Sequence, residues 1–72
     1  MPGLGGNMEI FLNGKQVQTG CSTLADLALE QQVETTSLVI ELNGTVIPEQ
    51  DWKNHPVSAG DRVELLHFVG GG

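Results

Sequence analysis

Residues 8–19, MEIFLNGKQVQT, have the pattern of a β-hairpin. The first half carries an apolar side chain at every second position, which is the period of a half-buried strand: Met8, Ile10 and Leu12. Asn13-Gly14 follows, and both residues tolerate the positive φ that a type I′ turn requires. We therefore expect residues 15–19 to return antiparallel to the first strand.

An amphipathic helix is predicted after the hairpin, over residues 24–31. Thr23 can cap its first turn, and Asp26 completes a T-x-x-D capping box. The apolar side chains that share one face of this helix are Leu24, Leu27 and Ala28. This face should pack against the hairpin.

A second hairpin and a final strand complete the pattern. Residues 38–42, LVIEL, are predicted to form a strand that ends at Asn43-Gly44, and residues 45–47 form its short return. Residues 49–54 can form a helical turn. Residues 62–69, RVELLHFV, then form the last strand.

The predicted order is therefore β-β-α-β-β-β, an α+β fold with one helix packed across one mixed β-sheet. The chain has 72 residues, which is enough for one small domain. We expect this domain to span residues 8–69. Residues 70–72 are predicted to be a flexible glycine tail, and the glycine-rich residues 1–7 a disordered extension or a remnant of cloning.

Composition excludes several classes of partner. The net charge of −6 has the wrong sign for binding nucleic acid or anionic lipid, so a protein partner should present a basic face. No apolar run approaches the roughly 20 residues that cross a bilayer, so we expect no membrane association. Cys21 is the only cysteine and no secretory leader is recognisable, which together predict a cytoplasmic protein.

No catalytic or metal-binding set of residues is recognisable. Cys21 precedes the predicted helix, and a helix N-terminus can lower a thiol pKa, but a single cysteine is more often a packing residue. His55 is expected to face solvent in a polar loop, and no motif surrounds His67. These three residues are too few and too separated for a zinc site. We therefore predict no metal and no cofactor.

The unusual feature of the sequence is its ending, Gly70-Gly71-Gly72. Glycines have no Cβ, so such a tail can enter a narrow channel that side chains would block. A frayed terminus or a cloning remnant would have the same composition. However, the tail continues an apolar strand and ends in a carboxylate, whose reference pKa is about 3.5. That group reacts with nucleophiles only after activation, for instance as an acyl-adenylate.

The residues that carry a family resemblance are 8–14, 23–27, 46–48, Trp52, 60–63 and, most specifically, the ending LHFVGGG at 66–72. On these residues the chain resembles the ThiS family of thiamin-pathway sulfur carriers, which are related to ubiquitin and to the small subunit of molybdopterin synthase. The resemblance implies a ubiquitin-like β-grasp fold and a protein that is not itself an enzyme.

The resemblance also implies a reaction at the terminus. An adenylating, ubiquitin-activating-like enzyme would use ATP to adenylate the carboxylate of Gly72, which is then converted to a thiocarboxylate. Gly70 and Gly71 would form the narrow segment, free of side chains, that leads to this carboxylate. The sulfur would pass to thiazole synthase, which forms the thiazole of thiamin.

A partner-binding patch is predicted on the last strand. Because strand side chains alternate between the two faces, Leu66 and Phe68 share one face, while the β-grasp resemblance places Val63 and Leu65 in the core. Leu66 and Phe68 would then lie on the open face near the tail. Two alternatives remain open: a molybdopterin-synthase-type sulfur carrier, and a ubiquitin-like interaction domain whose tail is inert.

Overall fold

The computed structural model describes residues 7–67 of the chain. Its elements are β1 (Met8–Leu12), β2 (Lys15–Thr19), α1 (Leu24–Glu30), β3 (Leu38–Leu42), β4 (Thr45–Ile47), the 3₁₀ helix η1 (Glu49–Asn54) and β5 (Arg62–His67). This order confirms the predicted β-β-α-β-β-β pattern, with η1 at the predicted helical turn. The extension expected at 1–7 falls outside the described residues except for Asn7, and so do the end of the predicted last strand and the glycine tail.

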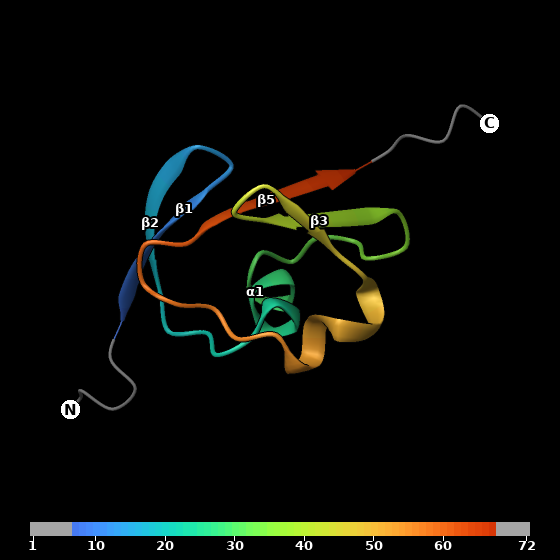
Figure 1. Ribbon diagram of the computed structural model, residues 1–72, viewed down its shortest axis with the longest axis horizontal. Helices are drawn as coiled ribbons and strands as arrows, with labels where there is room; N and C mark the ends of the chain where they lie inside the picture. Colours follow the sequence, from blue (N-terminus) through green and yellow to red (C-terminus); the bar gives the residue numbers. More distant parts are fainter. Residues whose placement is uncertain (1–6, 68–72) are drawn as a thin grey trace.

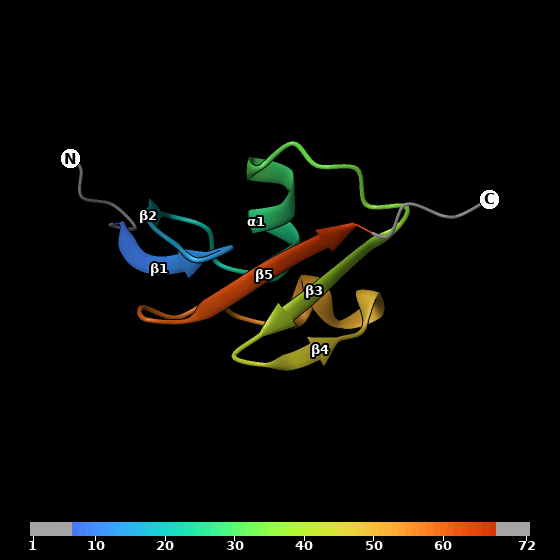
Figure 2. The same ribbon diagram turned by 90° about the horizontal axis from the view of Figure 1, so that it is seen from above.

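The five strands form one mixed sheet in the order β2-β1-β5-β3-β4. The central strands β1 and β5 are parallel, and the remaining neighbours are antiparallel. Figure 1 shows α1 on one side of this sheet, and Figure 2 shows β5 between β1 and β3. The opposite face carries no helix or strand from residues 7–67, and we call it the open face. The predicted α+β fold, one helix across one mixed sheet, is confirmed.

The two hairpin turns have the geometry that their Asn-Gly pairs predict. The φ angles are 50° and 83° at Asn13-Gly14, and 52° and 88° at Asn43-Gly44. Positive φ at both central residues defines the type I′ turn, whose twist matches that of the flanking strands. Local sequence therefore sets the register of both hairpins.

Asparagine side chains in these turns also hold β5 in place. The Oδ1 atom of Asn13 accepts a hydrogen bond from the backbone N–H of Leu65 at 2.8 Å. On the other side, Oδ1 of Asn43 accepts from the N–H of Arg62 at 2.9 Å. The two turns thus fasten the last strand along both of its edges.

The core lies between the sheet and α1. Its buried apolar side chains are Ile10, Leu12, Leu24, Leu27, Ala28, Leu38, Ile40, Leu42, Trp52, Val57, Val63 and Leu65. Full burial of a leucine- or isoleucine-sized side chain contributes about 1.5–3 kcal/mol, so this set drives folding. Thr23 caps α1 as predicted, because its Oγ1 accepts from the N–H of Asp26 at 3.2 Å. The indole N–H of Trp52 donates to the Ile47 carbonyl at 2.8 Å, which satisfies its one polar atom.

Candidate functional site

The candidate site begins at the end of β5, on the open face. Leu66 is half-buried there and lies directly opposite Val39 of β3. Val63 and Leu65 point the other way and are buried in the core, as the alternation predicts. Phe68, the second predicted patch residue, lies outside the described residues.

Further apolar side chains on the same face were not predicted as part of the patch. Phe11 of β1 is 37% exposed and Val46 of β4 is 55% exposed. Half-buried Val39 alternates with Leu38 and Ile40, which are buried in the core. Because side chains alternate between the two faces of a strand, the sequence of β3 could have placed Val39 on the face opposite to Leu38 and Ile40.

Carboxylates lie among these apolar side chains. Glu41 of β3 is directly opposite Glu64 of β5, and Val46 is the cross-strand partner of Glu41 on the other side. Like charges directly opposite one another repel and destabilise a sheet. Arg62 lies on the same face, two positions before Glu64, and lines one surface with both carboxylates, so the chain itself supplies a cation beside this pair.

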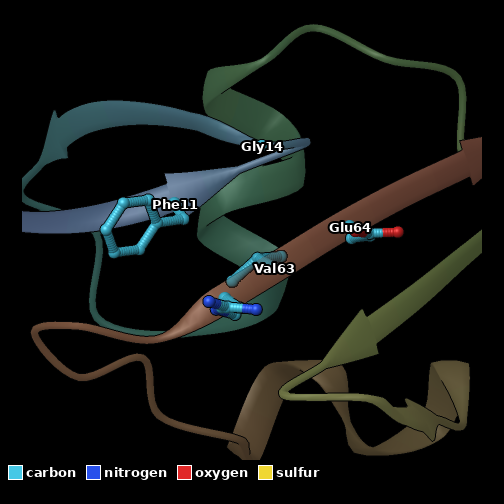
Figure 3. Close-up of a pocket in the computed structure, with 5 residues that line it drawn as sticks. Phe11, Gly14, Val63 and Glu64 are labelled. Carbon is cyan, nitrogen blue, oxygen red and sulfur yellow. The ribbon is translucent and has the colours of Figure 1, made fainter.

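A hollow of about 320 Å³ lies on the open face where β1 and β5 run parallel. The residues that line it are Phe11, Gly14, Arg62, Val63 and Glu64. In Figure 3 the Phe11 ring lies beside β1, and the Glu64 side chain points to the opposite side, toward β3. The hollow can receive one side chain from a docked protein, between the Phe11 ring and the charged side chains of Arg62 and Glu64.

The tail residues Gly70, Gly71 and Gly72 lie outside the described residues, but their starting point is defined. They follow β5, which pairs with β1 only at Arg62 and Val63 and with β3 as far as His67. The chain therefore reaches its glycine ending from a strand in the middle of the sheet. At its last two described positions this strand is paired with β3 alone.

Cys21 lies where its thiol is held in the protonated form. The side chain is half-buried against the core, and its Sγ donates to Oε1 of Glu30 at 3.3 Å. Burial raises the thiol pKa above its ordinary value of 9.0, and the adjacent Glu30 carboxylate raises it further, against an opposing hydrogen bond with Thr19. The lowering expected from a helix N-terminus is outweighed, because the Asp26 carboxylate in the first turn of α1 also raises the thiol pKa.

The two histidines have separate partners. His55 is half-buried, and its ring Nδ1 lies 3.3 Å from the carbonyl oxygen of Pro56 in a contact that is exposed. Its backbone carbonyl accepts from the N–H of Leu24 at 3.0 Å and holds this loop against the start of α1. His67 Nε2 is 2.7 Å from the carbonyl oxygen of Glu34. Within residues 7–67 no three metal-ligating side chains come together. No helix in that part of the chain is long and apolar enough to cross a membrane.

Comparison with known proteins agrees with this geometry. The model of the ThiS family matches residues 7–72. The sulfur carrier protein ThiS of Bacillus subtilis (strain 168) is 33% identical over 63 residues, which cover 85% of this chain and 96% of that protein. A thiazole synthase of Paramagnetospirillum magneticum is 27% identical over 66 residues, which cover 90% of this chain and only 20% of the synthase.

Solved structures agree as well. The crystal structure of the thiamine biosynthesis protein ThiS from Geobacter metallireducens superposes with a TM-score of 0.78 at 32% sequence identity. The match covers 90% of this chain and all of that one. Since the family model spans both the domain and the glycine ending, this chain belongs to the ThiS family.

Proposed function

We propose that this chain is the sulfur carrier for thiazole formation in thiamin biosynthesis, and that the carboxylate of Gly72 carries the sulfur. The observation that supports this most directly is a family match that extends through residue 72, so that it includes the three terminal glycines. Relatives along nearly the whole length are named sulfur carrier proteins.

The chemistry has two steps at the carboxyl group of Gly72, the first at an oxygen atom and the second at the carbon atom. The Gly72 carboxylate attacks the α-phosphate of ATP, which forms an acyl-adenylate and releases pyrophosphate. A donor that supplies sulfur at the oxidation level of sulfide then displaces AMP, so that one carboxylate oxygen leaves with the AMP and sulfur takes its place. The resulting thiocarboxylate is a strong nucleophile that remains covalently held until it reaches its acceptor.

The carrier itself supplies a docking face and a tail in this scheme, and an adenylating enzyme supplies the ATP site. The only thiol, Cys21, is held protonated by burial and by Glu30, which supports a structural role for it. Leu66, the neighbouring apolar side chains and the facing carboxylates Glu41 and Glu64 would contact the enzyme. An apolar partner surface with basic side chains complements this face.

Thiazole synthase is the proposed acceptor of the sulfur. One relative supports this choice, because nine tenths of this chain matches about a fifth of a protein named thiazole synthase. A cytoplasmic location is proposed with it, since the adenylation step consumes ATP and the chain has one cysteine and hence no internal disulfide. Neither alternative, a molybdopterin-type carrier or an interaction domain with an inert tail, is favoured by the family match.

Intact-mass spectrometry after incubation with ATP, a sulfur donor and the adenylating enzyme tests the proposal. The parent chain should gain the mass difference between sulfur and oxygen. A variant that lacks Gly72 should fold with an unchanged melting temperature and keep its mass. If a chain with a verified tag after Gly72 still supported thiazole synthesis, the terminal carboxylate would not be the reacting group.

A further inference from the structure

His67 is the last described residue of β5, and its side chain is fastened to a different part of the chain. Its backbone lies opposite Leu38, the first residue of β3. Its Nε2 atom is 2.7 Å from the carbonyl oxygen of Glu34, in the loop between α1 and β3. Figure 2 shows this loop and the end of β5 at the same end of the sheet.

The partner atom determines which group donates the hydrogen in this contact. A carbonyl oxygen can only accept a hydrogen bond, so Nε2 of His67 must carry the hydrogen. The separation lies at the short end of the range for N–H···O bonds. The bond forms with the neutral Nε2–H ring and with the imidazolium alike.

The bond acts where the strand is otherwise weakly held. Pairing with β1 ends at Val63, and the Asn13 side chain extends the support on that side only as far as Leu65. Beyond Leu65, β3 alone pairs with β5. The loop needs the contact as well, because Glu34 and the three residues after it are exposed and Val33 is the side chain of this loop that packs against the core.

Five residues, 68–72, follow His67 in the sequence. Five residues reach at most about 17 Å, so the place from which they start limits where the terminal carboxylate can be presented. If Leu66 and His67 came loose, the segment between the last paired residue and the terminal carboxylate would lengthen from five residues to seven. Because effective concentration falls with about the −3/2 power of length, the carboxylate would be diluted about 1.7-fold in an active site.

We propose that His67 is a positioning residue for the sulfur-carrying terminus. Its Nε2–H bond to the Glu34 carbonyl fastens the end of β5 to the α1–β3 loop and thereby fixes the start of the tail. This role rests on the proposed function, since it matters only if the terminus must reach a partner's active site.

Two variants of the full chain separate the hydrogen bond from the bulk of the side chain. His67→Leu retains volume and lacks a donor, whereas His67→Gln places an amide N–H at a similar reach. In His67→Leu the backbone amide of Leu66, which faces β3, should exchange with solvent about two- to tenfold faster, the range expected for one lost hydrogen bond. With the adenylating enzyme, kcat/KM for pyrophosphate release should fall about twofold. His67→Gln should match the parent in both measurements.

Binding of the carrier to the enzyme without ATP, measured by calorimetry, should be the same for all three proteins. Equal exchange and equal kcat/KM in His67→Leu and the parent would overturn the role. A weaker Kd that accounts for the whole loss would overturn it too, because His67 would then be a docking residue. Failure of the parent chain to be adenylated would instead overturn the proposed function, while the exchange rates would still report whether the bond holds the strand end.

Discussion

Replacing Leu66 with glutamine tests whether the open face is the docking surface. Leu66 is half-buried in the free chain, so a partner can cover only the exposed remainder. Full burial of a leucine contributes about 1.5–3 kcal/mol, so this remainder is worth about 1 kcal/mol. An unpaired amide in the interface costs about 1–2 kcal/mol more. Together these losses of about 2–3 kcal/mol correspond to a Kd for the adenylating enzyme that is about 30-fold to 150-fold weaker.

The fold should tolerate this change. Leu66 packs opposite Val39, and such a cross-strand pair contributes about 0.2–1 kcal/mol. For a domain of this size that loss lowers the melting temperature by at most about 8 °C. The variant should therefore remain folded at the temperature of the binding assay.

Leu65→Gln is the matched control, one residue away on the same strand. Leu65 is 9% exposed and belongs to the core, so its replacement buries an unpaired amide and costs about 2–5 kcal/mol. Small domains have a total stability near the lower end of about 5–15 kcal/mol, so this variant should melt far below the parent or fail to fold. Calorimetric binding and thermal melting of both variants test whether Leu66 is a docking residue and Leu65 a core residue. The reasoning is refuted if Leu66→Gln binds like the parent, or if it melts like Leu65→Gln.

Three further outcomes are expected. Gly71→Val places a β-branched side chain beside the reacting carboxylate, so adenylation should be abolished without a change in melting temperature; normal adenylation would mean that the glycines do not serve steric access. Asn13→Gly keeps the positive φ but removes the acceptor for the Leu65 amide, which should cost about 1–2 kcal/mol, whereas Asn13→Asp should stay close to the parent in urea unfolding. The folded state raises the pKa of Cys21 above 9.0, so the protonated thiol stabilises the fold at neutral pH. This contribution to the free energy of unfolding is lost as the pH rises through the folded pKa. Cys21→Ser should remove that part of the pH dependence, and Glu30→Gln should speed alkylation of Cys21 at pH 8; an unchanged alkylation rate would contradict the role of the carboxylate.

Leu66 shows how far the sequence could define the candidate site. Alternation along β5, together with the β-grasp resemblance, placed it on the open face, where the structure has it. Of the other apolar side chains on that face, Val39 of β3 lies directly opposite it, whereas Phe11 of β1 is in register with Arg62 and Val46 of β4 with Glu41. Which of their side chains lie near one another depends on strand order and register, and no pattern within a single strand encodes these.

The sequence by itself determined the two hairpins, the capped helix and hence the fold class, because alternation, Asn-Gly turns and Thr23 capping act between residues that are close along the chain. Tertiary structure alone decided what depends on distant partners. The Asn13 side chain bonds to a residue 52 positions away, and His67 to one 33 positions away, only because β5 inserts between β1 and β3. The direction of the Cys21 pKa shift likewise follows from folding, which buries the thiol beside Glu30 and removes it from the water that stabilises a thiolate.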